Sequence, residues 1–359
     1  MKLGLGLYRH QLNAEHYRFA RQCGCTHLVI HLVDYFRSSR SNLTGDQPVG
    51  DDSGWGLAGD AEKIWTFEEL AGIRKQINAA GLELEAIENF DPAHWHDVLL
   101  DGPQKTRQIE NLKTVIRNVG RAGIPVFGYN FSIAGVAGRI RGKFARGGAE
   151  AVGMEGPLDT PMPKGMVWNM VYDPASGTAA ETVSPATPEQ LWSRLKFFLD
   201  ELIPVAEEAG VTLAAHPDDP PLATVRGQPR LVWQPQLFQK LIDLKPSPRN
   251  ALELCLGTLA EMADGDIYEA VENYSRQNKL AYVHLRNVHG KVPFYKETFI
   301  DDGDVDVLRV LRILKKNKFD GVIIPDHAPQ MECASPWHAG MAYALGFLQA
   351  GLKAVQNER

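Results

Sequence analysis

The sequence predicts an α/β protein folded as a (β/α)8 TIM barrel, because short apolar segments alternate with helical patterns along its 359 residues. A coarse count gives eight strand–helix pairs. Four of the later apolar segments each end beside a side chain that can bind a metal ion. In such a barrel the carboxyl ends of all strands meet at one face, where active sites form. We therefore expect a single catalytic barrel domain over residues 1–359.

The first half of the chain supplies four strands and four helices of the expected barrel. The strands are predicted at Lys2–Tyr8, His27–Val33, Leu82–Asn89 and Val126–Phe131. The helices that follow them are predicted at Glu15–Gln22, Thr66–Ala80, Gln104–Ala122 and Pro188–Ala209. A glycine comes directly after three of these helices, where glycine commonly closes the last turn.

The second half supplies the four strands that end beside metal-binding side chains. These strands are predicted at Val211–Ala215, Ala251–Leu254, Leu280–Val283 and Gly321–Pro325. The residues that follow them are His216, Cys255, His284 and Asp326. The helices of this half are predicted at Pro235–Leu244, Asp266–Gln277, Val305–Asn317 and His338–Gln356.

Two imidazoles, a thiolate and a carboxylate at equivalent strand ends indicate one divalent-metal site. Each residue alone has a structural interpretation, since a lone histidine or cysteine is usually a core residue and an aspartate often caps a helix. Their joint occurrence favours a metal. A thiolate with imidazoles suits zinc slightly better, whereas a carboxylate with open positions also admits iron or manganese.

Two connections on the same side of the barrel are long, one after the second strand and one after the fourth. The first is Arg37–Lys63, and the second, residues 132–188, contains a basic stretch from Arg139 to Arg146. Long loops without their own secondary structure usually have a function. We expect residues 132–188 to form a lid that brings cations to an anionic substrate. The alternative is mobile decoration without a role.

Charge and cysteine content narrow the class of protein. The net charge of −6 argues against a nucleic-acid or anionic-membrane surface, and no apolar run reaches transmembrane length. Four cysteines in so long a chain do not make a disulfide framework, which favours the cytoplasm. A homo-oligomer is compatible with such a barrel, but no sequence feature indicates one.

Polar side chains at other strand ends are expected to contact the substrate. Glu88 ends the third strand, and Tyr129 and Asn130 end the fourth. Arg286 lies two residues beyond His284, on the same strand face by alternation, where a guanidinium can pair with a substrate carboxylate. Bracing of a loop is the alternative role for each of them.

Several motifs resemble the mannonate dehydratases, a metal-dependent TIM-barrel family related to the xylose-isomerase-like barrels. The motifs are His216-Pro-Asp-Asp-Pro-Pro221, Cys255-Leu-Gly-Thr258, His284-Leu-Arg286, Gly303-Asp-Val-Asp306 and Pro325-Asp326-His327 with Gln330-Met331. The resemblance extends from Trp65 to the C-terminus. It implies that the four strand-end residues are the metal ligands, and that the metal is Mn²⁺ or Fe²⁺ rather than Zn²⁺.

The chain departs from the family pattern in the parts that would surround a substrate. The family's Phe-His-Glu-Ala-Ala-His run after the seventh strand is replaced by residues 294–300, which keep Glu297 but neither histidine. A tyrosine expected near the start of the last helix has no secure counterpart, because Met341 falls there and Tyr343 is only nearby. We therefore expect an intact metal centre and an altered substrate pocket.

The resemblance implies dehydration of D-mannonate to 2-keto-3-deoxy-D-gluconate in hexuronate catabolism. One group must take the C2 proton and another must protonate the departing C3 hydroxyl. His327 is our first choice, because it adjoins a ligand and titrates near neutrality. Arg286 is also expected in catalysis, and Arg139 and Glu297 in binding a small anionic sugar acid. The alternatives are an isomerase or epimerase of free sugars, a dehydratase of another aldonic acid, a DNA-repair endonuclease and a silent sugar-acid binder.

Overall fold

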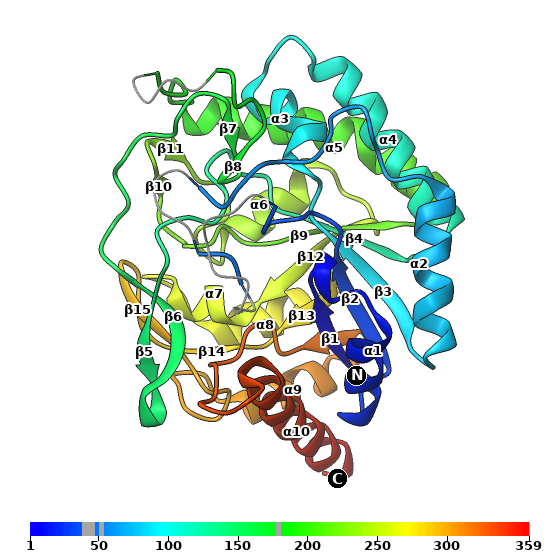
Figure 1. Cartoon of the computed structure of the whole chain (residues 1–359), viewed down its shortest axis with the longest axis vertical. Helices are drawn as coiled ribbons and strands as arrows, with labels where there is room; N and C mark the ends of the chain where they lie inside the picture. Colours follow the sequence, from blue (N-terminus) through cyan, green and yellow to red (C-terminus); the bar gives the residue numbers. More distant parts are fainter. Residues whose placement is uncertain (38–46, 50–53, 177–180, 359) are drawn as a thin grey trace.

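The structure, a computed structural model, describes residues 1–37, 47–49, 54–176 and 181–358 and contains a closed barrel (Figure 1). Its parallel strands pair in chain order, and the last strand pairs with the first. They are β1 (Lys2–Leu7), β2 (His27–His31), β3 (Glu83–Glu88), β4 (Val126–Tyr129), β9 (Thr212–Ala215), β12 (Asn250–Cys255), β13 (Leu280–His284) and β16 (Val322–Ile324). Each strand lies inside its predicted segment or exceeds it by one residue at one or both ends. The predicted fold class is confirmed.

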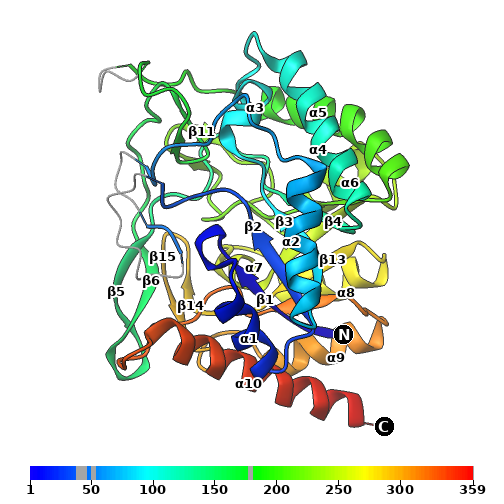
Figure 2. The ribbon, with the colours of Figure 1, turned by 45° about the vertical axis from the view of Figure 1, so that its right-hand side comes forward.

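Helices surround the barrel, and each helix that the sequence predicts is present (Figure 2). They are α1 (Ala14–Gln22), α2 (Phe67–Ala79), α4 (Lys105–Arg121), α5 (Pro188–Ala209), α6 (Leu237–Leu244), α8 (Ile267–Arg276), α9 (Val307–Lys316) and α10 (Pro336–Asn357). Among the described helices, none has the length and apolar composition needed to cross a membrane.

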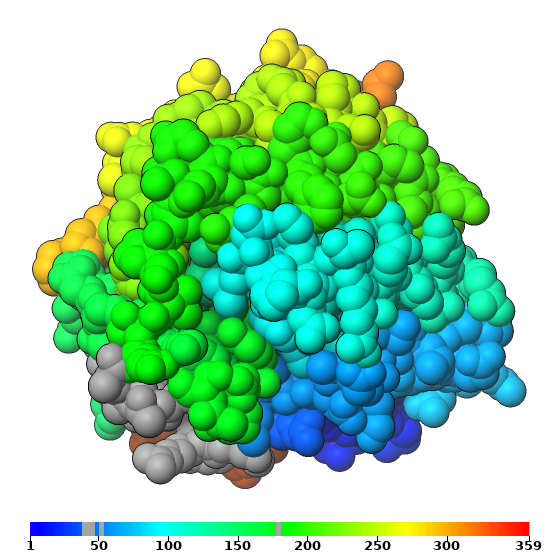
Figure 3. Space-filling view, turned by 90° about the horizontal axis from the view of Figure 1, so that it is seen from above, coloured from blue at the N-terminus to red at the C-terminus, as the bar shows by residue number. Residues whose placement is uncertain are grey.

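Two further α-helices, α3 (Pro92–Leu100) and α7 (Leu256–Glu261), were not predicted. Most residues of α3 and all residues of α7 are buried, so neither shows the one-sided apolar pattern of a surface helix. Figure 3 shows one face of the molecule, where cyan and green segments of the middle of the chain, including α3 to α5, form much of the surface.

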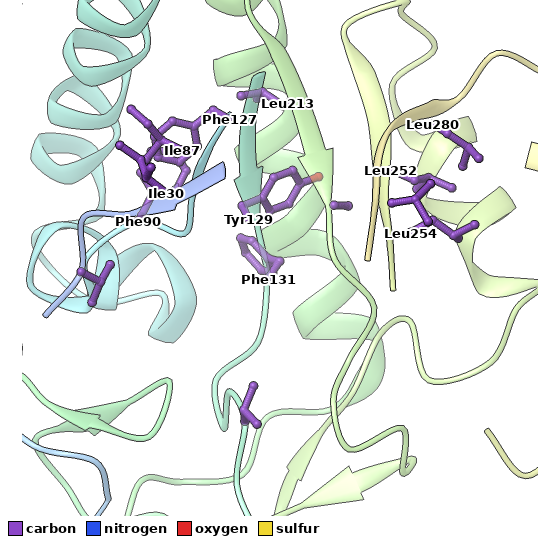
Figure 4. Packing of buried hydrophobic residues seen from close by; sticks show 14 of the residues in the cluster. Ile30, Ile87, Phe90, Phe127, Tyr129, Phe131, Leu213, Leu252, Leu254 and Leu280 are labelled. Carbon is purple, nitrogen blue, oxygen red and sulfur yellow. The ribbon is translucent and has the colours of Figure 1, made fainter. Parts of the chain in front are cut away.

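The barrel wall has two packing layers, because successive strand residues point to opposite faces. Along β4, Phe127 and Tyr129 pack outward into the hydrophobic cluster (Figure 4). The Tyr129 ring lies 5.0 Å from the Phe198 ring of α5. Gly128, between them, faces the barrel interior. The small inner cluster contains residues from six different strands: Val29, Ala86, Val126, Ala214, Tyr282, Val322 and Ile324.

The connection after β4 carries secondary structure of its own, which the sequence analysis did not predict. Strands β5 (Ile140–Ala145) and β6 (Ala149–Glu155) join β14 (Asn287–Lys291) and β15 (Phe294–Thr298) in an antiparallel sheet of order β14-β15-β6-β5. Figure 1 shows this sheet beside the barrel. The connections after β4 and β13 therefore fold together, although they lie far apart in the sequence. Two smaller two-stranded sheets pair β7 (Met166–Val167) with β8 (Met170–Val171) and β10 (Thr224–Val225) with β11 (Gln228–Pro229).

Gly128→Ala is expected to lower the free energy of unfolding by about 1–3 kcal/mol, because it overfills the barrel interior. A Cβ atom there would lie 2.4 Å from Tyr282 Oη and 2.5 Å from Glu253 Oε2. Thermal unfolding followed by circular dichroism measures the change. The control is Gly72→Ala within α2, where an added Cβ would meet no heavy atom of the described residues within 4 Å beyond its own helix turn, and alanine should stabilise the helix. Unchanged stability of Gly128→Ala would contradict this account of the interior.

Candidate metal centre

The four predicted metal ligands meet at the carboxyl-terminal face of the barrel. Cys255 and His284 end β12 and β13 and lie opposite each other in the parallel register. Cys255 Sγ lies 3.6 Å from Oδ2 of Asp326, and His284 Nδ1 lies 3.4 Å from its Oδ1. The ligand atoms of His216, Cys255 and His284 all fall within 4.8 Å of one another.

His216 is held in one tautomer by the turn that follows β9. Its Nδ1 lies 2.6 Å from the carbonyl oxygen of Pro217, to which a ring N–H at this position donates. The turn is itself fixed, because Asp218 Oδ2 accepts hydrogen bonds from the backbone N–H groups of Leu231 and Val232. Donation from Nδ1 leaves the lone pair of Nε2 available for a cation, as is usual for metal-binding histidines.

The charges around Cys255 favour its thiolate, the form that binds metals. Burial alone raises the pKa of the thiol, but the Arg286 guanidinium and the neighbouring rings of His216 and His284 outweigh it, so the pKa falls to about 6. Burial likewise lowers the pKa of His216, but Glu253 and Cys255 raise it to about 10. Without a cation, protons on the histidines balance the negative charge, and a divalent ion would displace those protons.

The donor set fits a divalent cation. It combines one thiolate, two imidazoles and one carboxylate, a mixture that binds zinc, iron or manganese. Both ring nitrogens of His284 are buried and lack a hydrogen-bond partner among the described residues. A buried polar group of this kind is unfavourable unless something binds it. The two ring nitrogens of His284 therefore need partners, and a metal ion would be the partner of one of them.

A cavity opens directly at this centre and contains four of the other predicted residues. His327, Asn130, Glu88 and Arg139 line it together with three of the ligands. Four aromatic residues also line it, namely Tyr8, Tyr35, Trp55 and Trp168. The predicted ligands and polar groups thus share the cavity with apolar rings, an arrangement that suits a small polar molecule with a carbon backbone.

His327 faces the cavity with a carboxylate behind it. Its Nδ1 lies 3.2 Å from Glu297 Oε1, and its Nε2 lies 3.3 Å from Asp326 Oδ1. Burial lowers the pKa of His327, but the carboxylates of Asp326 and Glu297 outweigh it, so the pKa is raised. Glu297 does not line the cavity. It supports His327 from behind, in place of the substrate contact that the sequence predicts.

Arg139 belongs to the same network and reaches the cavity from the connection after β4. Its Nη1 donates to Gln47 Oε1 at 2.6 Å and lies 3.6 Å from Glu297 Oε1 and 3.9 Å from Asp219 Oδ2. The predicted lid thus contributes one cation at the cavity wall. The next arginine, Arg141, donates to the backbone oxygen of Gln47 and does not line the cavity.

The structure corrects the prediction for Arg286. Its side chain is almost completely buried and does not line the cavity. The guanidinium lies among four carboxylates, and a substrate carboxylate therefore has no access to it. The four are Asp219, Glu261, Glu297 and Asp326. Arg286 Nε donates to Asp326 Oδ2 at 2.9 Å, so it holds a predicted ligand from behind.

The prediction for Tyr129 is wrong because of strand alternation. Tyr129 points away from the cavity into the layer between barrel and helices, where it packs on Phe198. The last helix also contributes no tyrosine to the cavity. Met341 is buried in the core, and Tyr343 Oη accepts a hydrogen bond from Arg146 at the surface.

Further residues line the cavity, some at strand ends and some on the long connections. Tyr8 follows β1 and His31 ends β2, so the strand-end position gave a signal for both. Their rings stack with centroids 4.7 Å apart. Trp55 and Trp168 come from the long connections, where no sequence pattern indicates which side chain turns inward. Trp168 Nε1 donates to Asn130 Oδ1 at 3.1 Å and fixes that amide.

Comparison with solved structures identifies the class of fold. The structure of mannonate dehydratase from Streptococcus suis superposes with a TM-score of 0.76 at 24% identity, covering 100% of this chain and 95% of that one. L-ribulose 3-epimerase gives 0.57 at 14% identity, covering 99% and 95%. A xylose isomerase domain protein from Planctomyces limnophilus gives 0.58 at 13% identity, covering 99% of both chains. The chain therefore shares the (β/α)8 barrel fold of these proteins.

Sequence comparison gives the family. Residues 55–150 and 178–356 match the D-mannonate dehydratase (UxuA) family. A mannonate dehydratase of Geobacillus thermodenitrificans is 31% identical over 323 residues, covering 83% of this chain and 85% of that protein. One of Thermotoga neapolitana is 28% identical over 315 residues, covering 80% and 87%. The chain belongs to the D-mannonate dehydratase family and is a hydro-lyase, which does not favour the sugar isomerase or epimerase alternative.

Proposed function

We propose that the protein removes water from D-mannonate and forms 2-keto-3-deoxy-D-gluconate, with Mn²⁺ or Fe²⁺ as its metal. The observation that carries this proposal is that His327 and three of the four predicted ligands line one cavity, with the fourth, Cys255, beside them, in a member of this family. The four cysteines are all free, which supports a place in the cytoplasm. The proposed reaction places the protein in hexuronate catabolism.

We assign the residues to three roles, which are metal binding, proton exchange and substrate binding. His216, Cys255, His284 and Asp326 hold the cation, which supplies Lewis-acid stabilisation of the charge that develops beside the substrate carboxylate. His327 exchanges a proton with the substrate through a ring nitrogen, with Glu297 fixing the ring. Arg139, Asn130 and Glu88 lie on the cavity wall, where they bind the carboxylate and the hydroxyl groups.

A second histidine on the wall suits the other proton transfer of the elimination. His31 lines the cavity, its Nδ1 is 3.4 Å from Tyr35 Oη, and its Nε2 is 3.6 Å from Glu88 Oε2. Burial lowers the pKa of His31, and the nearby Glu88 only partly opposes this effect. The residue is thus predominantly neutral at neutral pH and can accept a proton.

The test is an assay for 2-keto-3-deoxy acids with manganese-loaded protein, D-mannonate and a panel of other aldonic acids. We expect product from D-mannonate, none after treatment with a chelator, and recovery when Mn²⁺ is restored. Cys255→Ser should lose activity because the thiolate is lost. Cys23→Ser, which changes a half-buried thiol at the end of α1, should retain it.

Metal-loaded protein that dehydrates none of the acids would overturn the proposed reaction and leave the fold intact. Dehydration of a different aldonic acid would overturn only the assignment of D-mannonate. A chelator without effect would exclude the metal from the reaction.

A further inference from the structure

We infer that Glu253 and Glu88 hold the inner ring nitrogen of His284 and thereby present its outer nitrogen to the metal. Both are positioning residues, since they act through His284. The inference rests on the proposed metal centre and adds to it the residues that orient one ligand.

The two ring nitrogens of His284 face different groups. Nδ1 lies on the side of the predicted ligands, 3.4 Å from Asp326 Oδ1. Nε2 points deeper into the barrel, 3.1 Å from Glu253 Oε1 and 3.3 Å from Glu88 Oε2. A neutral imidazole has one N–H donor and one lone-pair acceptor. With the proton on Nε2, facing the carboxylates, the lone pair of Nδ1 is left for the cation.

The positions of these two carboxylates follow from the strands. Glu253 lies two residues before Cys255 on β12, so both side chains point into the barrel, one layer apart. Glu88 ends β3 on the other side of the interior. Gly128 makes room for them, since a side chain there would meet Glu253 and also Tyr282. The interior layer below the metal centre is thus shaped around this pair.

Burial makes these carboxylates unusual. Glu253 is completely buried and Glu88 is 5% exposed. Among the described residues, no well-aligned hydrogen bond reaches either oxygen of Glu253 or Oε2 of Glu88. Buried polar groups are unfavourable without a partner, and Nε2 of His284 lies within 3.1 Å of Glu253 and 3.3 Å of Glu88, where an N–H group can donate to them. Histidine ligands are commonly fixed by a carboxylate in this way, which sets the ring orientation and strengthens the metal bond.

The same three side chains could instead bind an ion directly, because Glu88, Glu253 and His284 have their ligand atoms within 4.8 Å of one another. Such an inner site contains no sulfur. The outer site contains Cys255. A cobalt ion bound to a thiolate gives a charge-transfer absorption band in the near ultraviolet, and this band distinguishes the two arrangements.

The experiment is titration of metal-free protein with Co²⁺ in competition with a chromophoric chelator, with the absorption spectrum recorded. We expect wild-type protein and Glu253→Gln to show the thiolate band, with Co²⁺ affinity about 10–100-fold lower in the variant. The matched control is Glu85→Gln, on the same strand as Glu88. The half-buried Glu85 carboxylate lies 3.9 Å from His27 Nε2 and does not line the cavity. Its affinity should equal that of wild type.

Each result has a clear meaning. Wild-type affinity in Glu253→Gln overturns the inference and leaves the metal centre standing. Wild-type protein that binds Co²⁺ without the thiolate band, with binding retained in Cys255→Ser and lost in Glu253→Gln, overturns the inference in favour of the inner site. Wild-type protein that binds no Co²⁺ overturns the metal centre itself. If Glu253→Gln does not fold, Glu88→Gln replaces it, because Glu88 makes the second approach to the same nitrogen.

Discussion

His327→Asn is expected to reduce kcat for D-mannonate dehydration by about 10²–10⁴-fold, the usual contribution of a general acid or base. Asparagine retains polarity and nearly the shape of the ring but cannot exchange a proton near neutral pH. His327 lines the cavity beside Asp326, and Glu297 lies 3.2 Å from its Nδ1. KM should change much less than kcat, since the proton is transferred only in the reaction.

Steady-state kinetics and the metal content of the purified variant test this prediction together. The matched control is His289→Asn, which changes an exposed histidine on β14 and should leave kcat unaltered. A kcat of His327→Asn close to that of wild type would remove His327 from the chemistry. A parallel loss of bound metal would show that the residue acts through Asp326 instead.

Arg286→Met is expected to lower the free energy of unfolding by about 3–5 kcal/mol, because it leaves buried carboxylates without their cation. The Arg286 guanidinium lies 2.9 Å from Asp219 and Asp326 and 3.3 Å from Glu297, and it also contacts Glu261. Asp219, Glu261 and Glu297 are buried, and Asp326 is partly buried at the cavity. Methionine keeps the volume of the side chain, so the change isolates the charge from the packing.

Urea denaturation of metal-free protein measures this effect without a contribution from metal binding. The control is Arg312→Met, which removes an exposed arginine paired with Glu358 and should change stability little. If Arg286→Met changed the free energy of unfolding equally little, the prediction would be wrong. The surrounding carboxylates would then become protonated with little loss of stability. Partial loss of metal affinity is also expected, since Arg286 fixes Asp326.

The barrel and the ligand set could be predicted from the sequence because both depend on local patterns. An apolar segment of strand length, followed by a helical repeat, marks each βα unit wherever it occurs. In a parallel barrel every strand ends at the same face, so His216, Cys255, His284 and Asp326 were expected together before any contact was known. His327, Asn130 and Glu88 reached the cavity for the same reason.

The roles of the supporting residues depended on contacts that no local pattern encodes. Which of two adjacent residues points inward is set by the register of neighbouring strands, and this turned Tyr129 toward Phe198 and away from the substrate. Arg286 was expected at the substrate, but the carboxylates that surround it come from four separate parts of the chain.

The antiparallel sheet of β14, β15, β6 and β5 likewise could not be predicted from local sequence patterns. Strands β5 and β6 pair with β14 and β15, whose residues follow more than a hundred positions later in the sequence. The sequence by itself therefore determined the barrel, its family and the four side chains proposed as metal ligands. Only the tertiary structure decided which groups face the substrate and which neutralise and orient them, because those choices depend on long-range packing and on charges that come together only in the folded chain.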